Sequence, residues 1–141
     1  MLFRSDLAAV EHPKIPGLFL LTAPARMRGR PVTETQMADL LREVRRRFDF
    51  CLLDAPAGLG RGFQLATCGA DRCVVVTTAD ASSLRDAQHT VMELDRFPAG
   101  TLHLVVNRVR KKLLRQLHAT IDDAIDKAGL PLLGEIGRAH V

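Results

Sequence analysis

The chain has 141 residues, of which 47% are hydrophobic and 26% are charged, so it can bury one sizeable core and a disordered chain is not expected. It lacks Trp and Tyr and has only six Phe, which argues against binding single-stranded nucleic acid by aromatic stacking. The formal net charge of +4 is mildly basic, and no apolar stretch reaches the roughly 18 residues of a membrane span.

The first predicted elements are a short strand and an amphipathic helix. The apolar run Leu18–Leu21 ends before Pro24 and is typical of a short strand. Thr33 and Gln36 have the spacing of a capping box, which predicts the start of a helix. Apolar side chains then recur at helical spacing and predict one buried face, while Arg45, Arg46 and Arg47 remain in solvent. The buried positions are Met37, Leu40, Leu41, Val44 and Phe48.

Three later apolar runs do not alternate with polar residues: 50–53, 74–78 and 102–106. Strands that are apolar on both faces are typical of parallel sheets covered by helices on each side. Helices predicted at 83–96 and 111–128 would supply that cover. Gly129, followed by Pro131, predicts the end of the last helix. The expected fold is one α/β domain with a doubly wound, mostly parallel sheet in three layers.

The run at 50–53 is followed by the sequence Asp-Ala-Pro-Ala-Gly at 54–58. A rigidly placed carboxylate at a strand end, such as Asp54, can hold the hydration shell of Mg²⁺ beside nucleotide phosphates. Gly58 lets a backbone amide approach a phosphate because no Cβ intervenes. This is the form of a Walker B strand, although an ordinary strand that ends in a turn explains the pattern equally well.

Polar residues also follow the other two runs. Ser83 and Asp86 can cap the helix after the second run, which would explain them without any function. After the third run, the amide of Asn107 can bind the edge of a purine and Arg108 can lie along the ring. An Asx turn that ends the strand is the alternative for Asn107.

Taken in order, these segments resemble the MinD branch of the MinD/ParA family of deviant Walker A P-loop ATPases, over residues 15–134. The turn at 54–58 is similar to the family's switch II, and residues 70–78 are similar to its next strand. Residues 82–87 resemble the helix start that follows. Residues 107–109 resemble the adenine-side motif, and residues 130–134 the strand after the long helix.

The resemblance implies a site for ATP and Mg²⁺. Asp54 would be the catalytic aspartate and would bind Mg²⁺ through water. Pro56 and Gly58 would lie at the γ-phosphate, while Asn107, Arg108 and Val109 would hold adenine. A dimer or partner surface is implied at Ser82, Ser83, Arg85 and Asp86.

Two features of the family are not found in the 141 residues: the Gly/Lys-rich Walker A loop, which should precede this region, and a C-terminal amphipathic membrane-targeting helix. Without the phosphate-binding loop, phosphoryl transfer loses most of its charge stabilisation. The resemblance also places the missing Walker A strand between the strand that ends at Asp54 and the strand at 74–78. We therefore expect an inactive chain that is marginally stable or associates.

Both ends of the sequence can be written as inverted copies of one DNA string, AGATCGGAAGAGCAC, which is a common sequencing adapter. We expect residues 1–5 and 135–141 to be non-native tails and residues 6–134 to be the later part of the nucleotide-binding domain, cut at each end. Arg4, Arg138 and Glu135 lie in these tails, so excluding them lowers the formal charge from +4 to +3.

Two groups of residues have simple structural explanations. The basic clusters could attract DNA or anionic lipid, but solvated helix faces explain them better. They are Arg45, Arg46 and Arg47, and Arg108, Arg110, Lys111, Lys112 and Arg115. The cysteines, Cys51, Cys68 and Cys73, lack metal-site spacing and are expected to be buried, reduced thiols.

The expected function of the intact protein is a cytoplasmic ATPase that dimerises on ATP and regulates placement of the cell-division site with other cell-division regulators. Peripheral contact with the inner face of the cell membrane is expected, and DNA binding is less expected. The alternatives are a ParA-like partitioning ATPase, a flagellar-placement ATPase and, from another class, a nucleotide-free α/β interaction module.

Overall fold

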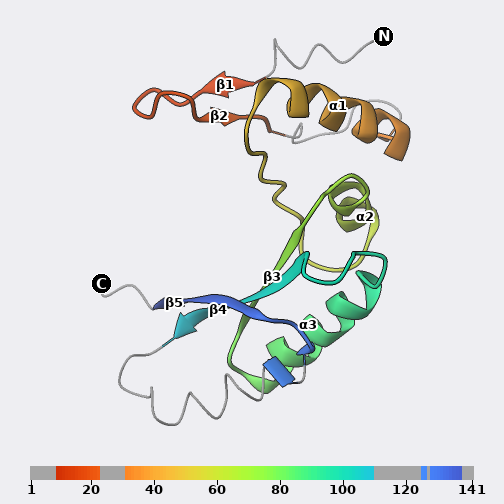
Figure 1. The fold of residues 1–141 in the computed structure, drawn as a ribbon, viewed down its shortest axis with the longest axis vertical. Coiled ribbons are helices and arrows are strands. Elements are labelled where there is room, and N and C mark those ends of the chain that lie inside the picture. The colour runs from red at the N-terminus through yellow and green to blue at the C-terminus, as the bar shows by residue number, and fades with distance from the viewer. Residues whose placement is uncertain (1–8, 23–30, 110–124, 127, 138–141) are drawn as a thin grey trace. The chain divides into compact units, whose positions relative to one another are not determined.

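The computed structural model describes residues 9–22, 31–109, 125–126 and 128–137 (Figure 1). The chain divides into two compact units, Met1–Gly69 and Ala70–Val141. Within the described residues, no helix is long and apolar enough to cross a membrane.

The first unit begins with a small antiparallel hairpin of β1 (Val10–Glu11) and β2 (Phe19–Leu20). Its turn is closed by a hydrogen bond from the His12 amide to the Leu18 carbonyl, at 2.7 Å. Gly17 takes a φ of +79°, which a glycine adopts without steric strain. The strand predicted at 18–21 is therefore present as β2, but it pairs antiparallel with a strand that the sequence analysis missed.

Helix α1 (Glu34–Arg47) confirms the predicted amphipathic helix. The Thr33 hydroxyl accepts a hydrogen bond from the Gln36 amide at 3.2 Å, and the Gln36 side chain accepts one from the Thr33 amide at 3.0 Å, as a capping box requires. Leu41 is buried on the apolar face. The ring of Phe48 meets that of Phe19 edge to face, with centroids 5.3 Å apart, and so connects the end of α1 to the hairpin.

Helix α2 (Arg61–Thr67) was not predicted. It is short, and Gly60 at its N-cap provides no side chain to accept a hydrogen bond, so the usual sequence signal is absent. Tertiary contacts hold it instead. Arg61 donates to the Val32 carbonyl at 2.7 Å, and Arg45 donates to the Gly69 carbonyl at 2.7 Å. A Cβ on Gly69 would lie 2.5 Å from Leu41 Cδ1, so a side chain here would force Leu41 of α1 to shift.

The strand predicted at 50–53 is the main error of the sequence analysis in the first unit. These residues belong to no strand in the structure. Phe50 is 90% exposed and Leu52 is 97% exposed. A strand needs a neighbour to satisfy its backbone groups and cover its side chains. None is paired with this segment among the described residues, so the apolar run alone does not make it a strand.

The second unit contains the predicted parallel sheet. It consists of β3 (Cys73–Thr78), β4 (Leu102–Val109) and β5 (Leu132–Gly137), in the order β3-β4-β5. Both pairings are parallel. Helix α3 (Ala81–Glu93) links β3 to β4 and packs on β3. The α/β class and the parallel sheet are thus confirmed, with α3 beginning two residues before the predicted start at Ser83.

The core of this unit lies between α3 and one face of the sheet. Leu104 and Val106 of β4 are fully buried, and Leu94 after α3 is 2% exposed. On β3 the burial alternates: Val75 is buried, but Val74 and Val76 are 49% and 59% exposed. Among the described residues, therefore, β3 is covered on one face rather than on both as the apolar run predicted.

The second covering helix, predicted at 111–128, lies mostly outside the described residues. Its end is described: Gly129 has a φ of +65° and its amide donates to the Ile125 carbonyl at 2.8 Å. The predicted C-cap glycine is confirmed. Strand β5 runs through Glu135 to Gly137, so residues expected to be tail take part in the sheet, which leaves their origin untested.

Candidate functional site

The predicted site residues come from three turns, each at or after an apolar run. The first turn, which carries Asp54, Pro56 and Gly58, belongs to the first unit and is exposed throughout. Gly58 has a φ of +86°, and a Cβ built on it would meet nothing within 4 Å. The backbone here is therefore open to a ligand, and L side chains rarely adopt this conformation.

The turn is attached to α2 by Pro56. A Cβ on Gly62 would lie 2.5 Å from Pro56 Cγ, so the proline ring packs against the first turn of the helix. Upstream, the Asp54 carboxylate is exposed. One accessible carboxylate suits Mg²⁺, which keeps most of its water ligands and takes few from protein. The chemistry of this donor fits a hydrated magnesium ion.

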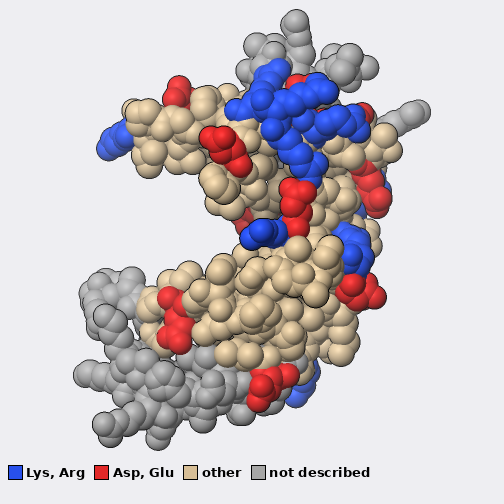
Figure 2. Space-filling model, in the orientation of Figure 1, with Lys and Arg blue, Asp and Glu red and all other residues tan. Residues whose placement is uncertain are grey.

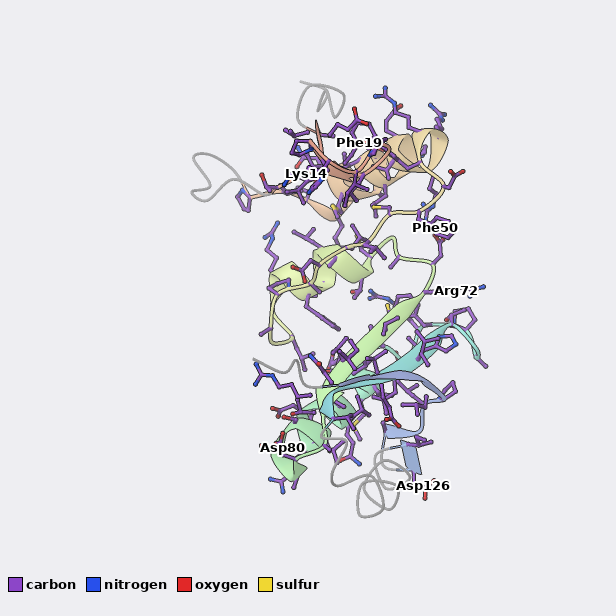
Figure 3. The ribbon with its side chains drawn as sticks, turned by 90° about the vertical axis from the view of Figure 1, so that its left-hand side faces the viewer. Lys14, Phe19, Phe50, Arg72, Asp80 and Asp126 are labelled. Atoms are coloured by element: carbon purple, nitrogen blue, oxygen red, sulfur yellow. The ribbon has the colours of Figure 1, made fainter. Side chains whose placement is uncertain are left out.

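The second turn lies between β3 and α3 and is organised around Asp80, labelled in Figure 3. One oxygen of its carboxylate accepts hydrogen bonds from the Ser82 hydroxyl at 2.6 Å and from the Ser83 amide at 3.0 Å. The other oxygen accepts from the hydroxyls of Thr78 and Ser83. Asp80 is therefore the N-cap of α3, and the prediction that Ser83 or Asp86 caps the helix is wrong.

Four donors around one carboxylate also decide its charge. These hydrogen bonds hold the pKa of Asp80 well below its ordinary value, and the bond from the Ser82 hydroxyl lowers it most.

The sequence analysis did not include Asp80 among its site residues. The signal was available, because an aspartate after a strand and just before helical residues is a typical N-cap. Of the predicted surface residues, Ser82, Arg85 and Asp86 are exposed and Ser83 is half-buried.

The third turn lies within β4 and contains Asn107 and Arg108. The strand was predicted to end at Val106, but it continues to Val109 through an irregularity in its pairing with β5. The Asn107 Oδ1 atom accepts a hydrogen bond from the Arg108 amide at 2.7 Å, and Arg108 takes a φ of +59°. One extra residue in a strand with a left-handed backbone is the geometry of a β-bulge. An Asx turn, in which the side-chain oxygen accepts from the amide two residues on, is therefore not formed here, and the strand does not end at Asn107.

The bulge leaves a defined set of groups for a ligand. One lone pair of Asn107 Oδ1 is used by the backbone, and no described residue accepts a hydrogen bond from its amide donor Nδ2, which suits a ring nitrogen of a purine. The Arg108 side chain is exposed, whereas Val109 is only 5% exposed and contributes to the core.

The register of the sheet brings two of the three turns together. Thr78 pairs with Asn107, so the Asp80 turn and the Asn107 bulge lie at the same carboxyl edge of β3 and β4. Ligands of open α/β sheets bind at this edge. The Asp54 turn belongs to the other compact unit.

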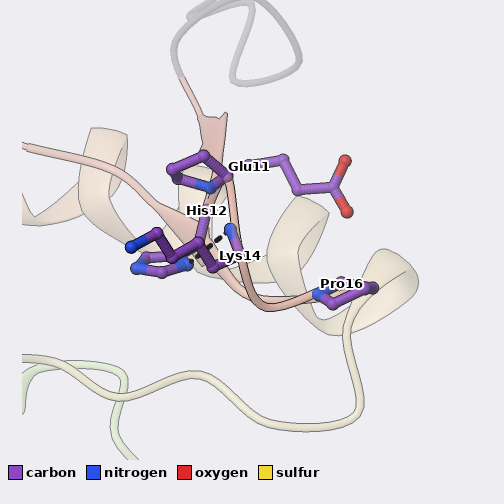
Figure 4. A pocket seen from close by; sticks show the side chains of 5 residues that line it. Glu11, His12, Lys14 and Pro16 are labelled. Carbon is purple, nitrogen blue, oxygen red and sulfur yellow. Dashed lines mark hydrogen bonds between the residues drawn. The ribbon is translucent and has the colours of Figure 1, made fainter.

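Two shallow hollows are present in the described part of the chain, and neither contains a predicted site residue. The first lies in the hairpin turn and is lined by Glu11, His12, Pro13, Lys14 and Pro16, with the Lys14 amide donating to His12 Nδ1 at 3.2 Å (Figure 4). The second is lined by Thr33, Glu34, Arg61, Gln64 and Leu65.

Basic side chains gather over α1 (Figure 2). Arg42 pairs with Asp39 at 2.8 Å, and Arg46 and Arg47 both pair with Glu43, at 3.4 and 3.5 Å. Exposed pairs of this kind contribute about 0–1 kcal/mol each. Their presence supports the interpretation of a solvated helix face over that of a DNA- or lipid-binding patch. The second basic cluster lies outside the described residues apart from Arg108.

The cysteines are all free thiols, as predicted, but their burial differs from the prediction. Cys51 is exposed, because no strand among the described residues pairs with the segment that carries it. Cys68 and Cys73 are half-buried. Burial raises the pKa of the Cys73 thiol, and the nearby charge of Arg96 partly offsets that rise.

Known proteins resemble this chain in sequence over most of its length. The sequence is 32% identical over 131 residues to a septum site-determining protein MinD of Synechocystis, covering 92% of this chain and 49% of that protein. It is 32% identical over 119 residues to the MinD of Bacillus subtilis, covering 83% of this chain and 44% of that protein. The chain thus spans about half the length of the curated relatives it matches. No family model matches.

Solved structures agree with the fold. A MinC:MinD cell division protein complex of Aquifex aeolicus aligns with a TM-score of 0.80 at 24% identity, covering 95% of this chain and 54% of that chain. A ParA family ATPase from Chlorobium tepidum aligns with a TM-score of 0.74 at 19% identity, covering 96% of this chain and 55% of that chain. At these identities the likeness concerns the fold.

Proposed function

We propose that this chain is part of a MinD-like protein of the MinD/ParA family of P-loop ATPases, which binds and hydrolyses ATP to regulate where the division septum forms. The observation that carries the proposal is its 32% identity to a septum site-determining protein over 92% of the chain. The parallel sheet, with polar turns at the carboxyl edge of β3 and β4, supports the same assignment.

Each turn has a role in this proposal. Asp54 would hold Mg²⁺ through its water ligands, and the open backbone at Gly58, next to Pro56, would face the γ-phosphate. Bound Mg²⁺ neutralises charge that develops on the phosphates during transfer. The free amide donor of Asn107 would bind the adenine edge, and the exposed Arg108 would lie along the base. Val109 would support this end of β4 from the core.

The partners follow from the same assignment. We propose that the intact protein dimerises on ATP binding and contacts a MinC-like regulator through the start of α3, where Ser82, Arg85 and Asp86 are exposed. A cytoplasmic location with peripheral contact to the membrane's inner face is proposed on the same basis. No Gly/Lys-rich phosphate-binding loop occurs in the 141 residues, so we expect this chain alone not to hydrolyse ATP.

The decisive test uses the complete reading frame recovered from the source DNA. We expect its product to contain a Gly/Lys-rich loop before this region and to bind Mg-ATP in calorimetric titration. The Asp54→Ala variant should weaken binding in Mg²⁺ by roughly tenfold or more, because the carboxylate orients the ion's ligands. Asp49→Ala is the matched control, because it removes a second exposed aspartate just before the same apolar run.

A product that binds no nucleotide would contradict the proposal and favour a nucleotide-free interaction module. Equal effects of Asp54→Ala and Asp49→Ala would show that Asp54 has no specific part in binding the metal and nucleotide.

The adenine contact can be tested separately in the same product. Asn107→Ala removes the free amide donor and should weaken ATP binding by about two- to tenfold, the effect of losing one hydrogen bond. Binding of inorganic triphosphate should not change, because it has no base. A loss that is equal for ATP and triphosphate would mean that the substitution disturbs the bulge rather than a contact with the base.

A further inference from the structure

The first turn of α2 contacts two other parts of the first unit. On one side the Pro56 ring packs against it, since a Cβ on Gly62 would lie 2.5 Å from Pro56 Cγ. On the other side the Arg61 guanidinium donates a hydrogen bond to the Val32 carbonyl, just before α1, at 2.7 Å. Arg61 thus connects the helix turn that supports Pro56 to the start of a longer helix.

The acceptor of the Arg61 hydrogen bond is itself held in place. Val32 and Thr33 share one peptide group, whose N–H donates to Gln36 Oε1 at 3.0 Å within the capping box of α1. The C=O of the same peptide accepts from Arg61. Both polar groups of this peptide are therefore used, and the capping box fixes the direction in which the carbonyl points. Helix α1, with 14 residues, provides the fixed end of the connection.

The first turn of α2 has little local support of its own. Gly60, at the N-cap, provides no side-chain hydrogen bond, and no acidic residue lies in the first turn. The positive charge of Arg61 also stands at the helix N-terminus, where the helix dipole disfavours it. Local helix chemistry therefore gives no reason for an arginine here, and the contact with the Val32 carbonyl gives one.

We propose that Arg61 is a positioning residue, which joins the first turn of α2 to α1 and thereby holds the turn of Pro56 and Gly58 in the conformation that receives the γ-phosphate. This inference rests on the proposed ATP-dependent function and deepens it. When the turn is correctly placed for only part of the time, the apparent affinity for ATP falls by that fraction. ADP has no γ-phosphate, so its binding does not depend on this turn.

Arg45 provides a matched control. Its guanidinium also donates to a backbone carbonyl at 2.7 Å, but the acceptor is Gly69, beyond the other end of α2. Arg61→Ala and Arg45→Ala therefore each remove one bond between an arginine and a carbonyl. The first bond lies next to the Pro56 turn, and the second lies at the opposite end of the helix.

The first measurement is amide hydrogen exchange in the 141-residue chain without nucleotide. The Gln64 amide, bonded to the Gly60 carbonyl, reports on the start of α2, and the Cys68 amide, bonded to the Gln64 carbonyl, reports on its end. Arg61→Ala should speed exchange at Gln64 by about three- to tenfold, the effect of losing one hydrogen bond, and change Cys68 less. Arg45→Ala should show the reverse order. Unchanged exchange at Gln64 in the Arg61→Ala chain would overturn the proposal.

The second measurement uses the complete product of the reading frame, titrated calorimetrically with ADP and with a non-hydrolysable ATP analogue. Arg61→Ala should weaken binding of the analogue by about three- to tenfold and leave ADP binding unchanged. Arg61→Lys, which keeps a positively charged donor, should recover part of the loss. Arg45→Ala should leave the ratio of the two affinities unchanged. A general loss of stability would weaken both nucleotides together.

The outcomes separate this inference from the proposed function. A wild-type product that binds no nucleotide would contradict the proposed function, and this inference with it. A wild-type product that binds both nucleotides, with an Arg61→Ala variant that keeps the same ratio of affinities, would overturn this inference alone. So would a loss of analogue binding without faster exchange at Gln64, because Arg61 would then act on the phosphate directly and not through the turn.

Discussion

Two apolar runs of similar length differ in structure: one forms a buried strand and the other is exposed and forms none. Residues 50–53 and residues 102–106 both precede a polar turn, and both were predicted as strands. Leu104 is completely buried in the central strand of a parallel sheet, whereas Leu52 is 97% exposed and belongs to no strand. Leu104 has β3 and β5 on either side, and the described residues pair no strand with Leu52. Apolar composition gives a segment the capacity to be a strand, and its neighbours decide whether it becomes one.

The largest expected effect comes from removing the same side chain in both runs. Leu104→Ala should lower the free energy of unfolding by about 2–5 kcal/mol, because it removes buried contacts and leaves a cavity. Leu52→Ala should change it by less than about 0.5 kcal/mol. Urea unfolding followed by far-ultraviolet circular dichroism, on dilute protein so that association does not contribute, measures both. Similar losses in the two variants would contradict the comparison.

A smaller effect tests the backbone of the paired region. Gly129→Ala forces a side chain into a φ of +65° at the helix end before β5, which should cost about 1 kcal/mol. Gly134→Ala is the control, because Gly134 lies in β5, its φ is not positive and a Cβ would meet nothing within 4 Å. The same unfolding experiment compares them. A control variant that loses as much stability as Gly129→Ala would show that the left-handed backbone is not the cause.

The smallest effect concerns the exposed cap of α3. The pKa of Asp80 is lowered in the folded protein, so its stabilising contribution is complete above the unfolded pKa of about 4 and is lost as the pH falls below it. Asp80→Asn keeps a capping side chain but no longer titrates. The stability difference between wild type and this variant should therefore shrink as the pH is lowered from about 5 to 3.

Asp86→Asn serves as the reference for this pH series, because it removes another exposed aspartate from the same helix without touching the cap. A stability difference for Asp80→Asn that stays constant over the pH range would contradict the role given to its hydrogen bonds.

Local signals in the sequence were sufficient where local interactions decide the structure. The capping box at Thr33 and the C-cap at Gly129 were predicted from adjacent residues and were confirmed. The apolar runs of β3 and β4 indicated a parallel sheet. This prediction was correct because each of these strands has a pairing partner within the same unit. The order of the turns along the chain was also enough to predict the resemblance to MinD proteins that the sequence comparison finds.

Tertiary interactions decided what the sequence analysis missed. Helix α2 has no capping side chain, and its position depends on contacts such as that between Gly69 and Leu41. The bulge at Asn107 depends on pairing with β5, which no local pattern encodes. The exposure of Cys51 and Phe50 depends on a neighbouring strand that is not paired with them among the described residues.

Hydrogen exchange on the dilute, monomeric chain tests the central comparison most directly. The amides of residues 50–53 should exchange at the rates of an unstructured peptide, while those of Leu104 and Val106 should be among the slowest in the chain. Comparable protection of both segments under these conditions would show that residues 50–53 have a strand partner within their own chain, and would contradict the account.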